Sequence, residues 1–203
     1  RFPESTQVLV ELPDGRCSGA MIGKDLVLTA GHCVHTGRGG KWRDWAKVYP
    51  GRDGRSSPYG SCMARRLYSV VGWTDHSDPN YDIGAIKLDC KVGEQSGWMG
   101  FFWQTATLVG ADARISSYPG DKPLEQWTHT EPVASDTATQ TRYRTDTMPG
   151  NSGSGVFAGR GAPNGCGGAC VHTAHAYGGA SANAGTRITR PLFENLVRWK
   201  NEP

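Results

Sequence analysis

Three residues of this chain have the chemical types of a nucleophile, its base and the group that orients the base. His32 follows a short apolar run, Asp82 stands directly before another, and Ser152 lies in a glycine-rich segment. A serine hydroxyl is a poor nucleophile at neutral pH, so it needs a base such as histidine to accept its proton. A carboxylate then fixes the imidazole tautomer and stabilises the imidazolium. We therefore predict that Ser152 attacks a carbonyl, with His32 as the base and Asp82 as the orienting carboxylate.

The glycines around the serine have a role of their own. The backbone N–H groups of Gly150 and Ser152 can both point at a developing oxyanion if the turn is tight and no side chain blocks it. The segment Gly150–Gly153 meets that requirement. We predict that these two N–H groups form an oxyanion hole.

Competing residues surround two of the three candidates. Ser154 is a weaker nucleophile candidate than Ser152, because no glycine stands two residues before it. Asp75 and Asp78 occupy the same polar stretch as Asp82. Only Asp82 is followed at once by a β-branched strand, as a buried orienting carboxylate requires.

The composition indicates many short strands joined by turns. The 203 residues include 28 glycines and 12 prolines, and the apolar stretches are short and β-branched, which is typical of all-β barrels or sandwiches. The formal net charge is only +3, and the charged residues of both signs are interspersed along the chain. Neither nucleic acid nor a membrane is therefore predicted as a partner. No apolar run approaches the ~18 residues that span a bilayer.

The six cysteines favour an oxidising compartment, because their number is even and no CxxC motif occurs. Many pairings are possible, and chain order with loop size favours Cys17–Cys33, Cys62–Cys90 and Cys166–Cys170. A zinc site is the alternative for Cys166, Cys170, His172 and His175. Their spacing is too compressed for the usual zinc arrangement, so we predict no metal. We expect a secreted, extracellular protein whose leader has been removed.

The strands must bring the three residues together from two halves of the chain. Strands are expected at Val8–Leu12, Cys17–Ile22, Leu26–Thr29, Leu67–Val71, Ile83–Leu88, Ala113–Ser117, Thr141–Thr145, Gly155–Phe157 and Ala169–Thr173, and an amphipathic helix at Pro191–Trp199. The segment Lys91–Gly100 is the expected connection. Residues 1–95 then carry His32 and Asp82, and residues 96–203 carry Ser152. A cleft between the halves would hold the substrate.

These motifs resemble a known superfamily. Thr29–Cys33 and Gly150–Ser154 resemble the chymotrypsin-like serine proteases. Further segments are similar to the bacterial glutamyl endopeptidase branch, namely Val48–Gly51, Tyr81–Lys87, Ser117–Lys122 and Asp146–Thr147. The resemblance implies two antiparallel six-stranded β-barrels, secretion as a zymogen and no cofactor.

One departure concerns the amino terminus. Animal-type members pair an Ile-Val-type terminus with an aspartate just before the serine, whereas this chain begins Arg1-Phe2-Pro3 and has Asn151 there. That ion pair cannot form in the usual way. Members of the glutamyl branch also carry asparagine at this place, so the departure supports the narrower resemblance.

Substrate preference has two readings. By superfamily spacing, Asp146 and Thr147 line the primary pocket. In the glutamyl branch, a histidine in the place of His172 receives the substrate carboxylate together with the threonine, which predicts cleavage after Glu and more weakly after Asp. The α-amino group of Arg1 could complete that site. The alternative makes Asp146 a trypsin-like anchor for Arg or Lys, and His175 is expected in a loop or at the pocket rim.

A second class of function stays open, because some proteins of this fold have lost catalysis and act as binding modules. The complete set of His32, Asp82 and Ser152 favours catalysis. We therefore predict a monomeric serine endopeptidase that acts on polypeptides without a cofactor.

Overall fold

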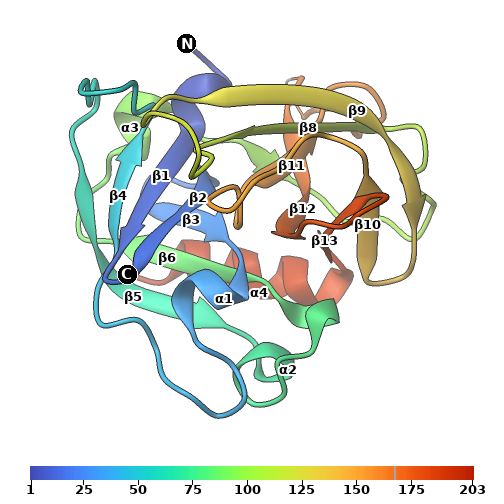
Figure 1. The fold of residues 1–203 in the computed structure, drawn as a ribbon, viewed down its shortest axis with the longest axis horizontal. Coiled ribbons are helices and arrows are strands. Elements are labelled where there is room, and N and C mark those ends of the chain that lie inside the picture. Colours follow the sequence, from blue (N-terminus) through green and yellow to red (C-terminus); the bar gives the residue numbers. More distant parts are fainter. Residues whose placement is uncertain (167) are drawn as a thin grey trace.

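The strands of the amino-terminal half close into a barrel (Figure 1). The computed structural model describes residues 1–166 and 168–203. The first barrel has the strand order β1-β2-β3-β6-β5-β4. Its strands are β1 (Gln7–Leu12), β2 (Gly15–Met21), β3 (Leu26–Thr29), β4 (Lys47–Pro50), β5 (Cys62–Ser69) and β6 (Gly84–Leu88). All its pairings are antiparallel.

The carboxyl-terminal half forms a second barrel. The sheet order β11-β8-β9-β10-β13-β12 is closed by pairing of β11 with β12. Its strands are β8 (Asp112–Ser117), β9 (Trp127–Asp136), β10 (Gln140–Tyr143), β11 (Gly155–Ala158), β12 (Cys170–Tyr177) and β13 (Asn183–Arg187). The short strand β7 (Gly100–Phe101) adds to β12 in parallel. The prediction of two six-stranded antiparallel barrels is confirmed.

The carboxyl-terminal helix crosses back onto the first barrel. The predicted helix forms as α4 (Arg190–Asn201), with a proline in its first turn and Leu192, Leu196 and Trp199 buried. Lys87 of β6 is buried, pairs with Asp25 at 3.0 Å, and donates to the carbonyl oxygens of Trp199 and Lys200. The helix that follows the second barrel is therefore fixed to the first.

The remaining helices are single turns. They are η1 (Glu4–Thr6), α1 (Gly31–Val34), α2 (Val71–Thr74), η2 (Pro79–Tyr81) and α3 (Gly93–Ser96). The expected strand at Leu67–Val71 ends earlier, because β5 stops at Ser69 and Val71 begins α2. In the described part of the chain, no helix has the length and apolar character of a membrane span.

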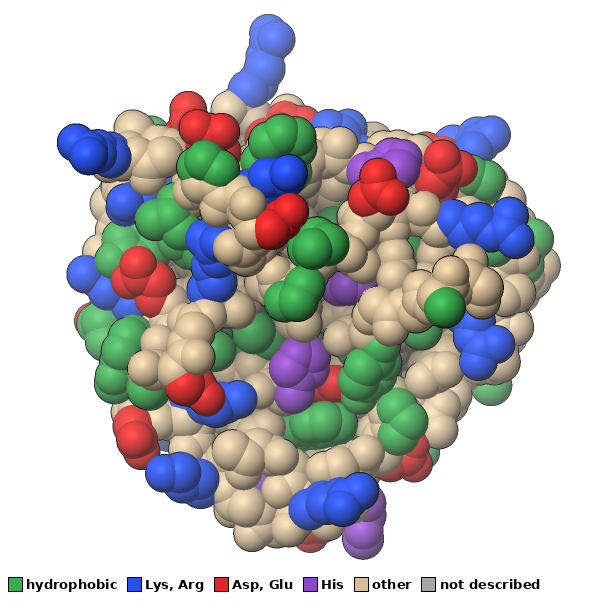
Figure 2. All heavy atoms as spheres, in the orientation of Figure 1, with side chains coloured by type: hydrophobic (Ala, Val, Ile, Leu, Met, Phe, Trp, Pro, Cys, Tyr) green, Lys and Arg blue, Asp and Glu red, His purple; other side chains and the backbone are tan. Residues whose placement is uncertain are grey.

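Apolar side chains fill each barrel and the space between them. The shared cluster draws Leu28 and Ala85 from the first barrel, Phe157 and Val171 from the second, and Leu196 from α4. Removing this apolar surface from water favours docking of the two barrels. The docked barrels leave a hollow on the face shown in Figure 2, with histidine and hydrophobic side chains in it and charged side chains around it.

Three disulfides cross-link the fold. They join Cys17 to Cys33, Cys62 to Cys90 and Cys166 to Cys170. The first ties β2 to α1, the helical turn that carries the candidate base. Because Cys166 and Cys170 are bonded to each other, neither offers the thiolate that a zinc ion would need.

Candidate active site

Strand pairing in the first barrel brings His32 and Asp82 together. His32 lies in α1 just after β3, and Asp82 lies just before β6, the strand that pairs with β3. Asp82 is fully buried. Its Oδ2 lies 2.8 Å from Nδ1 of His32, and its Oδ1 accepts the backbone N–H of His32 at 2.8 Å. The carboxylate thus fixes the ring with Nδ1 protonated and leaves Nε2 to accept a proton.

The two other aspartates of this stretch bind elsewhere. Asp78 caps η2 by accepting the backbone N–H of Asn80 at 2.9 Å, and Asp75 accepts the hydroxyl of Thr74. Both carboxylates are engaged within their own segment. Asp82 is the carboxylate that pairs with His32 among the described residues.

A strand of the first barrel holds the turn that carries Ser152. The backbone N–H of Ser18 in β2 donates to the carbonyl oxygen of Ser152 at 2.8 Å. The hydroxyl of Ser18 donates to the carbonyl oxygen of Gly150 at 2.8 Å. The carbonyl oxygen of Ser152 also lies 3.6 Å from Sγ of Cys33, the residue after His32. These contacts place the serine turn against α1. Sequence reasoning missed Ser18 because its partners lie in the other barrel.

The turn leaves two N–H groups free. Gly150 and Gly153 have φ values of +100° and +89°, a region that L side chains rarely adopt. A Cβ at Gly150 would lie 2.7 Å from the carbonyl oxygen of Tyr118. Within the described residues, the N–H groups of Gly150 and Ser152 donate to no protein acceptor. They are therefore available to an oxyanion. The hydroxyl of Ser154 is buried and donates to the carbonyl oxygen of Asn151 at 2.6 Å, which removes it as a nucleophile.

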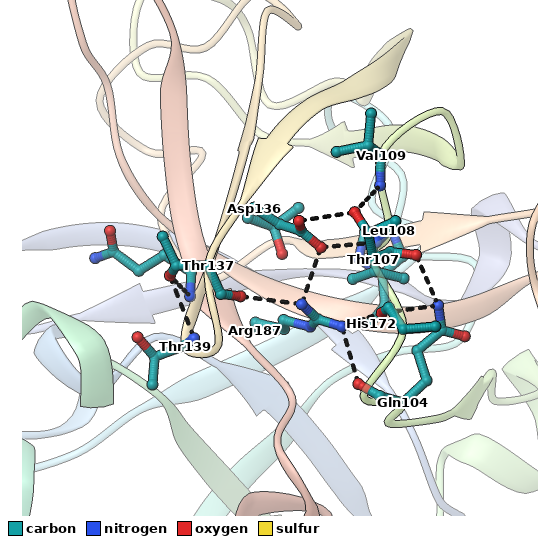
Figure 3. A network of polar contacts seen from close by, with 12 residues as sticks. Gln104, Thr107, Leu108, Val109, Asp136, Thr137, Thr139, His172 and Arg187 are labelled. Carbon is teal, nitrogen blue, oxygen red and sulfur yellow. Dashed lines mark hydrogen bonds and ion pairs between the residues drawn. The ribbon is translucent and has the colours of Figure 1, made fainter.

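His172 does not offer a free nitrogen to a substrate carboxylate. Its Nε2 lies 3.1 Å from the carbonyl oxygen of Asp112, and its Nδ1 lies 3.0 Å from the hydroxyl of Thr173. Figure 3 shows it beside the network in which Arg187 binds Asp136. Burial lowers the pKa of His172 to about 4, and the charge of Arg187 acts in the same direction. This corrects the expected pocket role of His172: it is a structural histidine inside the second barrel.

Neither of the two charged groups expected at the primary pocket is a buried anchor there, although Asp146 lines a cavity together with Thr147. The Asp146 side chain is 97% exposed and pairs with Nδ1 of His129 at 3.5 Å. An anchor for a substrate cation would need to be buried, because water screens an exposed carboxylate. Arg1 lines a separate pocket with Tyr59 and Gln126, so its α-amino group does not complete a site at Thr147.

His175 lies in the strand that faces the serine turn. It is 2% exposed and belongs to β12, so the expectation of a loop or rim position was wrong. Its backbone N–H donates to Ser154 at 2.9 Å, and its carbonyl oxygen accepts from Gly153 at 2.8 Å. Burial, followed by the charge of His32, lowers the pKa of His175 to about 3. The ring is therefore neutral and close to the candidate base.

A tyrosine hydroxyl contacts the ring of His175. The hydroxyl of Tyr143 lies 2.7 Å from Nδ1 of His175. Burial raises the pKa of Tyr143, so its hydroxyl keeps its proton and can donate a hydrogen bond to Nδ1. In the tautomer that accepts this bond, Nε2 of His175 carries the ring hydrogen and is a donor. The hydroxyl of Thr147 is also buried without a partner among the described residues, and it lies near Gly178, just beyond β12.

The two buried histidines are expected to destabilise the fold in mild acid. The pKa of His172 is about 4 and that of His175 about 3, whereas an unfolded histidine titrates near about 6.5. Between these values the unfolded chain binds protons that the folded chain does not. The free energy of unfolding therefore falls as the pH drops below about 6.5, by roughly 1.4 kcal/mol per pH unit for each histidine. Urea denaturation between about pH 7 and about pH 5 measures this slope. A constant free energy across that range would contradict it.

Comparisons with known proteins agree with this geometry. The chain matches the sequence profile of the Trypsin family over residues 2–193. It is 42% identical over 204 residues to a glutamyl endopeptidase of Bacillus licheniformis, covering 98% of this chain and 64% of that protein. It is 37% identical over 188 residues to an extracellular metalloprotease of Bacillus subtilis, covering 92% and 58%. A solved structure of a Glu endopeptidase in complex with MPD superposes with a TM-score of 0.90 at 25% identity, covering 99% of this chain and 93% of that one. The chain spans about three fifths of the length of these curated relatives.

Proposed function

The chain belongs to the Trypsin family, and from that premise we propose that it is a serine endopeptidase. His32 is the base, Asp82 orients it, and Ser152 is the nucleophile. The observation that carries this proposal is the pairing of the buried Asp82 with His32 at 2.8 Å, beside a serine turn with two free N–H groups. A non-catalytic binding module would have no need of this arrangement.

The reaction follows from these positions. The hydroxyl of Ser152 attacks the scissile carbonyl while Nε2 of His32 takes its proton. Asp82 stabilises the imidazolium, and the N–H groups of Gly150 and Ser152 stabilise the tetrahedral oxyanion. His32 then gives its proton to the leaving amine, which leaves an acyl group on Ser152. Water attacks that ester by the same steps, and the free enzyme returns.

The pocket chemistry favours a substrate carboxylate. The hydroxyl of Thr147 is buried without a protein partner in the described part of the chain, and Nε2 of His175 binds no described protein group. A hydroxyl and an imidazole N–H are donors of the kind that a carboxylate accepts. We assign cleavage after Glu, and more weakly after Asp, to this pair. Asp146 does not support cleavage after Arg or Lys, because its side chain lies in solvent. The name of the Bacillus licheniformis relative agrees with this assignment.

The expected setting is extracellular, with polypeptides as substrates. Three disulfides fit an oxidising compartment, and the Bacillus subtilis relative is named as extracellular. That relative is also named a metalloprotease. In this chain, the described groupings of metal-ligating residue types both contain disulfide-bonded cysteines, Cys17 with Cys33 and Cys62 with Cys90. Such sulfurs are not thiolate ligands, so these residues do not fit a metal.

A probe and a pair of peptides test the proposal together. A fluorophosphonate should label Ser152, as located by peptide mapping. Two peptides that differ only in Glu or Arg before the scissile bond should be cleaved with at least about a hundredfold preference for Glu. Preference for Arg would refute the Glu assignment and leave the serine peptidase. Absence of both labelling and cleavage in the folded protein would favour a binding module.

A further inference from the structure

The backbone turns sharply at Asp82 before the chain enters β6. Asp82 follows η2 and has φ and ψ values of −73° and 69°, which are those of an inverse γ-turn. The backbone N–H of Ile83 accordingly donates to the carbonyl oxygen of Tyr81 at 2.7 Å. Asp82 is thus neither helical nor part of β6, which begins at Gly84. Its own carbonyl oxygen needs a donor from elsewhere, because Asp82 is fully buried.

The second barrel supplies that donor. Thr186 of β13 is fully buried, and its hydroxyl donates to the carbonyl oxygen of Asp82 at 3.0 Å. The carbonyl oxygen of Pro79, at the start of η2, is a more distant acceptor for the same hydroxyl at 3.4 Å. Nearby, the hydroxyl of Thr139 donates to Oδ1 of Asn80 at 2.7 Å. Both η2 and the residue that follows it therefore rest on β13 and on the turn between β9 and β10.

The position of the carboxylate follows the backbone of Asp82, because an aspartate side chain is short. Both of its oxygens bind His32, Oδ1 through the backbone N–H and Oδ2 through Nδ1, each at 2.8 Å. We propose that Thr186 is a positioning residue of the triad, whose hydroxyl fixes the backbone at Asp82 and thereby the carboxylate that orients His32. Thr186 acts through Asp82 and not on the substrate. This inference rests on the proposed function of the triad.

Each barrel then fixes a catalytic segment of the other. Ser18 of the first barrel holds the serine turn through the carbonyl oxygens of Gly150 and Ser152. Thr186 of the second barrel holds the carbonyl oxygen of Asp82. Ser18 and Thr186 are both fully buried, and a buried carbonyl group that loses its donor has no water to replace it. Removal of the Thr186 hydroxyl should therefore displace the segment that carries Asp82.

Thr186→Val removes the hydroxyl and keeps the shape of the side chain. The kcat for a peptide substrate should fall by about tenfold, because a small displacement of a catalytic group is costly, while KM stays within about twofold of wild type. Thr186→Ser, which keeps the hydroxyl, should retain kcat within about twofold. The matched control is Thr141→Val in β10, which should leave kcat near wild type. Thr141 is also fully buried, and its hydroxyl accepts that of Thr173 at 2.8 Å within the second barrel.

Three results with these variants would overturn the role of Thr186. They are a kcat within twofold of wild type in folded Thr186→Val, a tenfold loss in folded Thr186→Ser, and an equal loss in Thr141→Val. Thr186→Ala also lacks the hydroxyl and adds no bulk, so it gives the same test if Thr186→Val does not fold.

A readout without turnover separates this proposal from the proposed function. The Nδ1 proton of His32 lies in the hydrogen bond to Asp82, and its resonance can be followed by proton NMR in the full chain. The resonance should move in Thr186→Val and keep its wild-type position in Thr186→Ser and Thr141→Val. This comparison holds even if the wild-type chain cleaves no peptide. An unchanged resonance in the folded hydroxyl-free variant, or an equal shift in Thr141→Val, would contradict the proposal.

Discussion

Replacing Ser152 by alanine is expected to lower kcat for a peptide substrate by a factor on the order of a million. Without the hydroxyl there is no nucleophile for His32 to activate, and only oxyanion stabilisation and substrate binding remain. The fold should survive, because the contacts that position this residue use its backbone carbonyl. Progress curves of peptide hydrolysis measure the loss of kcat. Thermal unfolding of the same protein checks that the variant is folded.

A buried serine in β8 provides the control for that loss of activity. Ser116 of β8 is fully buried, and its hydroxyl bonds with that of Thr128 at 2.7 Å, away from the serine turn. Ser116→Ala should reduce stability by roughly 1 kcal/mol and leave kcat near wild type. Substantial peptidase activity in a pure Ser152→Ala protein would remove Ser152 as the nucleophile.

Replacing His175 by leucine should abolish most of the preference for Glu over Gln before the scissile bond. The ratio of kcat/KM for two peptides that differ only in that residue should fall from about a hundredfold to below about tenfold, because the pocket loses its Nε2–H donor. This ratio does not depend on the fraction of protein that is folded, because both peptides are assayed with the same protein sample. Tyr143→Phe should lower this ratio less, because the imidazole of His175 remains but its tautomer is no longer fixed by the Tyr143 hydroxyl.

His172→Leu separates the two histidines of β12. Its ring is held by Asp112 and Thr173, so this variant should lose stability and keep the ratio. Collapse of the ratio in His172→Leu, with retention in His175→Leu, would restore the role that the sequence resemblance implied for His172.

Strand context made the contact between His32 and Asp82 predictable. His32 lies three residues after the end of β3 and Asp82 two residues before the start of β6, and these strands pair so that Thr29 faces Gly84. Each residue could therefore be placed from its own short segment. The glycine turn around Ser152 carries the same kind of local information, because its φ values need glycine whatever the rest of the chain does.

The specificity residues were harder to place, for reasons of packing. Seven of the eight residues of β12 are buried, so alternation of polar and apolar types does not indicate which histidine faces the cleft. The strand is also irregular, with a register shift between His175 and Tyr177. Resemblance pointed to His172, whereas contacts with Tyr143 and the serine turn single out His175.

An unpredicted strand explains the exposed position of the Asp146 side chain. Strand β9 is largely exposed and contains Pro132, and neither feature signals a long strand. It carries His129, which pairs with Asp146 at the surface.

The two bonds that Ser18 makes to the serine turn bear on the order of events in folding. The residues that shape the oxyanion site lie in one barrel and the strand that fixes them lies in the other. If the proposed triad is catalytic, its competence therefore depends on docking of the two barrels and is absent from either barrel alone. A nascent chain with one finished barrel would then be unable to cleave other chains or itself.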